Sequence, residues 1–418
     1  MRNVIVIGGG AAGMMAALFA AREGARVTLL ERNEKLGKKL YITGKGRCNV
    51  TNAADMEQFQ RRIFRNPRFM YAAFAALDNR ALMDLMESLG VPLKVERGER
   101  VFPESDKASD IISALQRELR RLGVDVRLNA RVKALVIENG ACAGVLMEDG
   151  GHLAADAVVV ATGGLSYPTT GSTGDGYRFA EAAGHAVTNT LPALTAIETV
   201  ESWPGMLSGL SLRNVALSAY VKGGKKEKRL YAEQGELLFT HFGISGPLAL
   251  TLSSLLPEDL QKVRLSIDLK PALDAQTLDA RLLRDFKAMS RKQLTSVMDG
   301  LAPHSLGEQV LKLAGLSPAQ PVNSVTAQQR ESLLRVLKDL PLTPRGLRGF
   351  NEAIITRGGV AVKGINPSTM ASKLTKNLYF AGEVLDVDAQ TGGFNLQIAW
   401  STGALAGRCA AAEDGERE

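Results

Sequence analysis

Val4-Ile5-Val6-Ile7-Gly8-Gly9-Gly10-Ala11-Ala12-Gly13 is the stretch that decides the fold. Four apolar residues in a row are typical of a strand buried in a parallel sheet, and the pattern Gly8-x-Gly10-x-x-Gly13 follows them directly. Gly8 permits a tight turn, Gly10 lets the backbone approach a pyrophosphate, and Gly13 allows the next helix to pack closely on the sheet. The stretch therefore predicts a strand, a turn and a helix that together bind a dinucleotide.

The residues that follow complete a βαβ unit. A helix is predicted from Ala11 to Arg22, with Gly24 as its stop signal, and a second strand over Val27–Leu30. Glu31 ends this strand roughly 20 residues beyond the glycines, where a carboxylate can accept both hydrogens of a ribose diol. The predicted cofactor contacts from this unit are Gly8, Gly10, Ala12, Gly13, Glu31 and Arg32.

Two further stretches indicate that the dinucleotide is FAD. Residues 377–383 (NLYFAGE) predict a strand that ends in Gly382 and Glu383, and residues 390–395 (QTGGFN) open a last helix. This arrangement resembles the second fingerprint of the glutathione-reductase-like FAD family, in which an acid, usually Asp, bonds the ribityl chain. Residues 158–164 (VVVATGG) resemble the strand crossover that the same family places beside FAD. The resemblance implies cofactor contacts at Val132, Thr162, Gly163, Gly382, Glu383, Asn395, Leu396, Gln397 and Ile398.

A basic, glycine-punctuated loop runs from residue 34 to residue 52. Its Lys38, Lys39, Lys45 and Arg47 come just after the ribose-binding strand, where cations and free backbone N–H groups can hold diphosphate oxygens. A solvated basic loop is the alternative interpretation. We predict cofactor contacts from this loop at Lys39, Gly46 and Arg47.

Longer motifs indicate which family of FAD-binding proteins the chain resembles. Residues 37–40, 43–52, 169–176, 240–247 and 356–360 are similar to the signatures of the BaiN/RdsA-type flavoproteins, and the resemblance extends over essentially the whole chain. It implies tightly bound FAD, a two-part inserted domain, and NAD(P)H as the electron donor. Members are linked to reduction of steroid carbon–carbon double bonds and to dihydrouridine formation in large-subunit ribosomal RNA.

The order of the predicted elements implies an α/β fold. We expect a Rossmann-type FAD-binding domain of the glutathione-reductase-like class, made from residues 1–190 and 341–418. An inserted β-rich subdomain over residues 191–273 and an inserted helical subdomain over residues 274–340 interrupt it. The insertion is inferred from strand patterns at 212–221, 229–232 and 263–269, followed by a charged helical pattern.

Catalytic candidates are few. Cys48 lies inside the basic loop and could act as a proton donor near the flavin, although a buried structural cysteine is the more common case. His241 is a candidate acid or a hydrogen-bonded structural histidine, and Arg357 could hold an anion or form a structural ion pair. No metal-ligand cluster or catalytic triad pattern is evident, so the flavin would carry the redox chemistry.

The composition is ordinary for a globular protein. Of 418 residues, 45% are hydrophobic and 23% are charged, and the formal net charge is +7, which favours anionic partners. The three cysteines form no C-x-x-C pair, which argues against a disulfide framework, zinc, or the dithiol of a disulfide reductase. No window offers the roughly 20 apolar residues of a membrane span. We expect a cytoplasmic protein with no metal and no membrane partner.

Three functions are compatible with these features: an NAD(P)H-driven reductase of a free small molecule such as a steroid-like enone, the same chemistry on uridine in 23S ribosomal RNA, and a non-catalytic flavin-binding regulator. The regulator ranks last, because it would not need cation-rich loops around the whole cofactor. Charge and the family resemblance favour RNA, provided that the basic runs share a face with the flavin. These runs are Arg61, Arg62, Arg65 and Arg68; Lys222, Lys225, Lys226, Lys228 and Arg229; and Arg345, Arg348 and Arg357.

Overall fold

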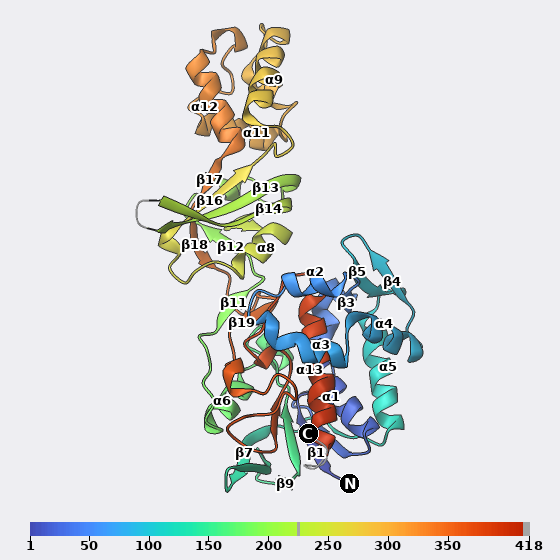
Figure 1. Ribbon diagram of the computed structural model, residues 1–418. Helices are drawn as coiled ribbons and strands as arrows, with labels where there is room; N and C mark the ends of the chain where they lie inside the picture. The colour runs from blue at the N-terminus through green and yellow to red at the C-terminus, as the bar shows by residue number, and fades with distance from the viewer. Residues whose placement is uncertain (224–225, 413–418) are drawn as a thin grey trace. The chain divides into compact units, whose positions relative to one another are not determined.

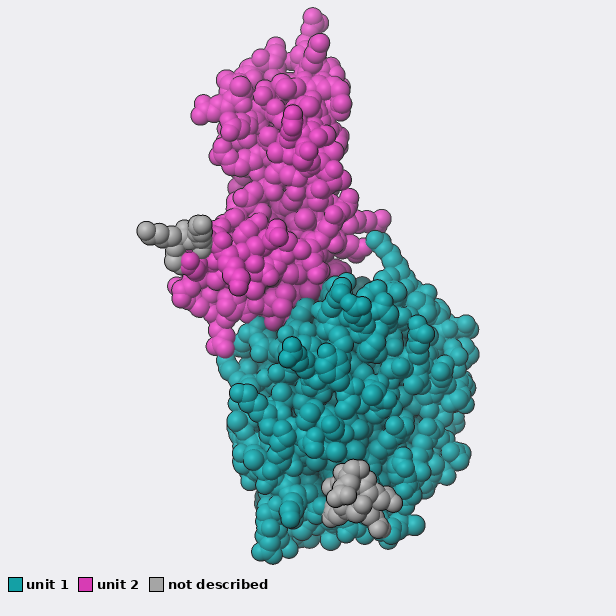
Figure 2. All heavy atoms as spheres, in the orientation of Figure 1, with its two compact units in different colours: residues 1–193, 350–418 teal, residues 194–349 magenta. Residues whose placement is uncertain are grey.

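The chain forms two compact units. The computed structural model describes residues 1–223 and 226–412, except for the side chain of residue 226. Unit 1 comprises residues 1–193 and 350–418, and unit 2 comprises residues 194–349 (Figure 2). Each unit buries a hydrophobic core of its own.

A parallel five-stranded sheet lies at the centre of unit 1. Its order is β20 (Leu378–Phe380), β10 (Ala157–Val160), β1 (Asn3–Ile7), β2 (Arg26–Leu30) and β6 (Asp125–Arg127). The side chains of Val158, Val159 and Val160 are fully buried, which explains why β10 is an unbroken run of valines. The predicted Rossmann-type α/β fold is confirmed.

Helices α1 (Ala11–Arg22) and α13 (Phe394–Ala411) come from the two ends of the chain and lie side by side (Figure 1). Their backbones approach closely because glycines face the other helix. A Cβ on Gly403 would lie 2.3 Å from the carbonyl oxygen of Ala12, and a Cβ on Gly407 would lie 2.2 Å from that of Ala16. This contact fixes the last helix on the first βαβ unit.

Smaller elements surround this sheet. A further helix, α5 (Ala108–Arg121), packs against α1. The small sheets are β3–β5–β4 (Thr51–Asn52, Arg100–Pro103, Leu93–Glu96), β7–β8–β9 (Val132–Glu138, Ala141–Met147, His152–Ala154) and the pair β11–β19 (Leu191–Ala193, Ile355–Arg357). The short helices are α2 (Met56–Arg61), α3 (Tyr71–Ala76), α4 (Asn79–Ser88) and α6 (Asp175–Ala182). The 3₁₀ segments include η1 (Leu40–Gly46), η3 (Pro168–Thr170) and η7 (Gly382–Val384).

Unit 2 contains an antiparallel seven-stranded sheet. Its order is β17 (Leu340–Leu342), β16 (Val263–Asp268), β13 (Ser211–Gly223), β14 (Lys226–Thr240), β15 (Gly243–Ser245), β12 (Ile197–Thr199) and β18 (Pro344–Leu347). Its helices are α7 (Trp203–Met206), α8 (Pro247–Ser253), α9 (Ala275–Ala288), α10 (Leu294–Met298), α11 (His304–Leu313) and α12 (Ala327–Lys338). Sheet and helices share one core.

The bounds of unit 2 follow its strand pairing. The sequence placed the return to the FAD domain at residue 341, whereas β17 pairs with β16 and β18 pairs with β12, so unit 2 extends to Gly349. Strand β14 runs through Thr240, well beyond the strand expected at residues 229–232. The basic run from Lys222 to Arg229 includes residues 224 and 225, which lie outside the described residues. Within the described ranges, no helix combines the length and apolar character needed to cross a bilayer.

Because α1 packs closely on α13, one methyl group added at their contact should destabilise the fold. Gly407→Ala should lower the free energy of unfolding by about 1–3 kcal/mol, because the new Cβ would overlap the backbone of α1. Gly349→Ala is the control, since a Cβ there meets no atom within 4 Å. Chemical unfolding curves of both variants provide the test, and equal stabilities would contradict the helix contact.

Candidate cofactor site

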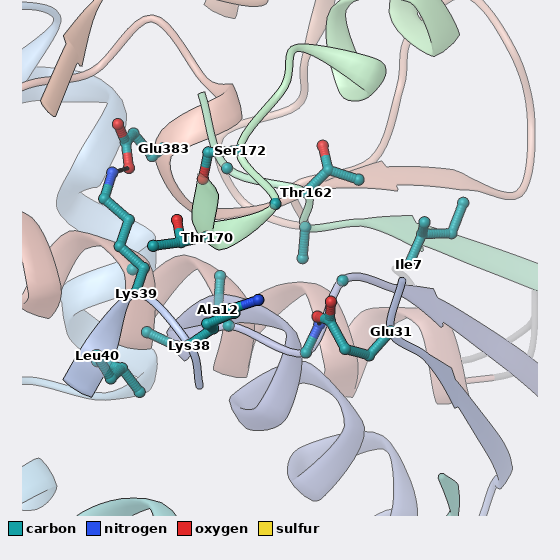
Figure 3. Close-up of a pocket in the computed structure, with 18 of the residues that line it drawn as sticks. Ile7, Ala12, Glu31, Lys38, Lys39, Leu40, Thr162, Thr170, Ser172 and Glu383 are labelled. Atoms are coloured by element: carbon teal, nitrogen blue, oxygen red, sulfur yellow. Dashed lines mark hydrogen bonds and ion pairs between the residues drawn. The ribbon is translucent and has the colours of Figure 1, made fainter. Parts of the chain in front are cut away.

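A groove runs across unit 1 at the carboxyl ends of β1, β2 and β10 (Figure 3). It encloses about 1330 Å³, part of which is open to solvent. Its lining comes from several segments of unit 1 that are far apart in the sequence, from Ile7 to Ala399. Glu31 and Glu383 lie toward opposite ends of it in Figure 3.

The glycine turn forms the floor of the groove. A Cβ on Gly8 would lie 2.5 Å from the carbonyl oxygen of Ala161, and one on Gly13 would lie 1.7 Å from that of Gly8. Gly10, by contrast, has open space where its Cβ would be. Helix α1 begins at this turn with no acidic side chain in its first turn, so its unpaired N–H groups can bind a phosphate.

Glu31 is held at one end of the groove. It is buried, and its Oε2 accepts a hydrogen bond of 2.7 Å from the backbone N–H of Gly9. Its Oε1 accepts bonds of 2.8 and 2.7 Å from the backbone and side-chain nitrogens of Asn33. Each carboxylate oxygen has two lone pairs, so Oε1 is fully occupied and Oε2 can still accept one hydrogen bond from a ribose hydroxyl.

A charged cluster surrounds this end. Arg32 donates to Asp175 at 3.1 Å, and Arg131 lies 3.8 Å from the same carboxylate. All three residues line the groove. Arg32 was predicted from the sequence, whereas Asp175 and Arg131 were missed; for Arg131, adjacency to the predicted contact Val132 was the one available signal.

Glu383 anchors the other end of the groove. Its Oε2 accepts a 2.6 Å hydrogen bond from the Lys39 ammonium, and its Oε1 accepts from Ser166 and from the backbone N–H of Thr356. Lys39 also donates to Ser166 at 2.7 Å. The family that this fingerprint resembles usually has Asp here. In this chain the extra methylene of Glu383 spans the distance to a lysine from the basic loop.

The first turn of α13 forms a wall of the groove. Asn395 lines it, and the side chain of Asn395 binds the backbone N–H and carbonyl of Ala389 at 2.9 and 2.8 Å. Thr162 also lines the groove. Its hydroxyl is buried on the side of Gly176, where an added Cβ would lie 2.2 Å from it, and has no hydrogen-bond partner among the described residues.

The structure places most of the predicted cofactor residues on this groove. The residues that line it are Gly8, Gly10, Ala12, Glu31, Arg32, Lys39, Val132, Thr162, Gly163, Glu383, Asn395, Leu396 and Ile398. The predicted residues outside its lining are Gly13, Gly46, Arg47, Gly382 and Gln397.

Two of the residues outside the lining are engaged elsewhere. The guanidinium of Arg47 donates to Glu96 at 2.7 Å and to Asp106 at 3.1 Å, so it ties the basic loop to the β4–β5 hairpin. Gln397 is fully buried and bonds to Thr51 and to the carbonyl of Leu77. Both polar side chains therefore stabilise the scaffold.

The three catalytic candidates occupy different environments. Cys48 is fully buried, and burial raises the pKa of its thiol to about 12, so it is a neutral thiol at physiological pH. Arg357 is buried in β19, next to Thr356. His241 lies exposed in unit 2, between β14 and β15. Neither Cys48 nor Arg357 lines the groove.

Other lining residues were not predicted as contacts. Thr170, Ser172 and Thr356 belong to motifs that resemble the family signatures, so polar residues in those motifs were the signal. Four apolar residues also line the groove: Phe179, Ile354, Ile355 and Val387. The sequence alone does not distinguish an apolar residue of a groove wall from one of the hydrophobic core, because both follow the same periodic pattern.

Known proteins resemble this chain along nearly its whole length. The model of the HI0933-like protein Rossmann domain family matches residues 2–409. A 3-dehydro-bile acid delta(4,6)-reductase from Clostridium scindens is 33% identical over 98% of this chain and 99% of its own. A ribosomal RNA dihydrouridine synthase from Escherichia coli is 31% identical over 96% of both chains. The structure of a 3-ketosteroid-delta4-(5alpha)-dehydrogenase from Rhodococcus jostii has a TM-score of 0.51 at 18% identity, over 99% of this chain and 97% of its own.

Fold and groove together define a Rossmann-type FAD-dependent oxidoreductase. The chain belongs to the HI0933-like Rossmann domain family. The predicted FAD fold and family resemblance are thereby confirmed.

The hydrogen bonds of Glu31 predict how FAD affinity depends on it. Glu31→Ala should weaken FAD binding by about 1–3 kcal/mol, the contribution of a hydrogen bond to a charged group and of a buried partner left unpaired, or roughly 5–150-fold in Kd. Glu34→Ala is the matched control, because Glu34 is exposed and pairs with Lys38 at the surface. Titration of each apoprotein with FAD, followed by flavin fluorescence, measures both. Equal affinities would contradict a role for Glu31 in the site.

Proposed function

We propose that this chain reduces a carbon–carbon double bond with electrons from NAD(P)H, and that its favoured substrate is uridine in 23S ribosomal RNA. The observation that carries the proposal is the near full-length similarity to two relatives whose named reactions share one chemistry. Both a delta(4,6)-reductase and a dihydrouridine synthase add two hydrogens across a double bond that is conjugated to a carbonyl group.

The groove residues have matching roles in this proposal. The Gly8–Gly13 turn and the start of α1 would bind the diphosphate of FAD, Glu31 the adenosine ribose, and Glu383 with Lys39 the ribityl side. The bound flavin would supply hydride transfer. The sequence contains no second G-x-G-x-x-G pattern, so NAD(P)H would reach the flavin without a Rossmann domain of its own.

Charge supports the RNA substrate. The formal net charge is +7, and Arg68 in unit 1 and Lys222, Lys228 and Arg229 in unit 2 are exposed. The third basic run contributes less, because Arg345 and Arg348 both pair with Glu198 and Arg357 is buried. Among the three basic runs, exposed cations therefore lie at the β13–β14 hairpin and at Arg68, beyond the end of α2.

A free small molecule such as a steroid-like enone is the second candidate substrate. The 33% identity to a bile-acid reductase over 98% of the chain favours it. Ile354, Ile355, Val387 and Leu396 also line the groove, and such an apolar wall suits a hydrophobic substrate beside the flavin.

Ribosomal RNA from cells that lack this protein tests the favoured substrate directly. We expect one uridine of the 23S RNA to lose the two-hydrogen mass increment of dihydrouridine, and we expect the wild-type gene to restore it. Mass spectrometry of nuclease fragments measures the increment. An unchanged RNA, together with NAD(P)H-dependent reduction of an enone by the purified protein, would establish the small-molecule alternative.

The β13–β14 hairpin predicts the salt dependence of RNA binding. Replacing Lys222, Lys228 and Arg229 with alanine should weaken binding to a 23S transcript. It should also reduce the slope of log K against log salt by roughly 0.7–0.9 for each phosphate that the variant no longer neutralises. FAD content should be unchanged, since the hairpin belongs to unit 2 and the groove to unit 1.

The control removes three exposed cations from the helical part of unit 2 instead: Lys287, Lys292 and Lys312. It has the same net charge as the hairpin variant. Equal slopes for both variants would mean that binding follows net charge alone, and the hairpin would then be no RNA-binding surface.

A further inference from the structure

The loop between Glu383 and α13 forms part of the groove wall and contains two buried acids. Val387 lines the groove, and so does Asn395, which holds the backbone of the neighbouring Ala389. The backbone N–H of Phe64, a residue that does not line the groove, donates to the carbonyl of Asp388 at 2.9 Å. Asp386 and Asp388 thus flank the wall residue Val387 in the sequence without lining the groove themselves.

The side chain of Asp388 has an unusual environment. It is 1% exposed, and neither of its carboxylate oxygens has a hydrogen-bond partner within the described part of the chain. One oxygen of Asp386, which is also buried, lacks such a partner as well. Buried polar groups are almost always hydrogen-bonded, and a buried charge without such bonds is strongly disfavoured. A proton on Asp388 would remove this cost.

Three charged groups face Asp388. The Nε atom of Arg65 lies 3.3 Å from Oδ1 of Asp388, and 38% of the Arg65 side chain is exposed to solvent. Arg357 also favours the carboxylate, whereas Asp386 opposes it. Burial outweighs the two arginines and raises the pKa of Asp388 to about 7. Asp388 can thus gain or lose a proton near neutral pH, on the side where Arg65 reaches solvent.

We propose that Asp388 is a redox-linked proton site, whose carboxylate binds one proton from solvent for each electron pair that enters the groove. The inference rests on the proposed function for the supply of that pair, which comes from NAD(P)H through the bound flavin. The new negative charge in the groove disfavours the carboxylate of Asp388, as any nearby like charge does. An O–H bond then forms on Asp388.

The stoichiometry is balanced over a full cycle. Saturation of one double bond consumes a hydride and a proton, and forms two C–H bonds. When the electron pair leaves as that hydride, the O–H bond of Asp388 breaks and its proton returns to solvent, while the product takes up one proton from solvent, so that each cycle consumes one hydride and one proton. Asp388 acts through the charge in the groove, so it is a positioning residue for the proton and not a catalytic residue in contact with substrate.

The midpoint potential of the FAD-loaded protein tests this inference. One proton per two electrons adds about 30 mV per pH unit to the dependence of the potential on pH. We expect the wild type to show this added slope above pH 7 and Asp388→Asn to lack it. Asp84→Asn, at an exposed acid in unit 1, is the control and should retain it. An unchanged slope in Asp388→Asn would overturn the inference.

The apoprotein gives a second measurement that needs no flavin. The folded-state pKa of Asp388, about 7, exceeds the ordinary value, so the folded chain binds more protons than the unfolded chain between about pH 4 and pH 7. The stability that this proton provides is lost as pH rises through 7. The drop in Tm from pH 5 to pH 8 should therefore be smaller in Asp388→Asn than in wild type and Asp84→Asn.

Arg65→Gln provides an independent variant should Asp388→Asn fail to fold. Loss of the neighbouring positive charge should move the added slope and the drop in Tm to higher pH. Unmoved curves would overturn the inference. A wild-type protein that binds no FAD would instead overturn the proposed function, so the two failures are distinguishable.

Discussion

The contact between Gly13 and the carbonyl oxygen of Gly8 fixes where α1 begins. A Cβ on Gly13 would lie 1.7 Å from that oxygen, so only glycine allows the first turn of α1 to fold back onto the end of β1. The phosphate-binding end of α1 is thereby placed at the groove. The backbone of α1 also receives Gly403 and Gly407 of α13, and α13 in turn positions Asn395 and the loop that contains Asp388. Three glycines thus connect both ends of the chain to one site.

The parts of the fold that the sequence predicted are those in which local pattern and tertiary environment agree. The helix expected at Ala11–Arg22 has those bounds in the structure, because a glycine turn precedes it and its small apolar side chains are buried. Strand β20 and the last helix were predicted for similar reasons. Strand β14 was underestimated, because residues 233–235 (EQG) carry no apolar side chain and only their pairing with β13 identifies them as strand.

The site was predictable to a similar degree. Glycines and acids at the carboxyl ends of strands could be predicted, because parallel strands bring these ends together at one edge of the sheet. Glu31 and Glu383 are examples, and both line the groove. Arg47 and Gln397 have polar side chains that could bind a cofactor. In the structure they form hydrogen bonds with Glu96 and Thr51, residues far away in the sequence that the pattern could not identify as partners. Apolar wall residues such as Val387 could not be found from sequence, because packing alone separates them from the core.

The insertion of unit 2 has a consequence for synthesis on the ribosome. Strands β11 and β19 pair where the chain leaves and re-enters unit 1, and residues 194–349 lie between them. Unit 2 is continuous in sequence, so it can fold while the chain is still growing. Unit 1 cannot, because β20 and α13 are needed to complete its sheet and cover α1. At 5–20 residues per second, β10 waits roughly 10–45 s for β20, and α1 waits roughly 20–75 s for α13. Exposed apolar surface of this kind favours aggregation while a chain is being synthesised.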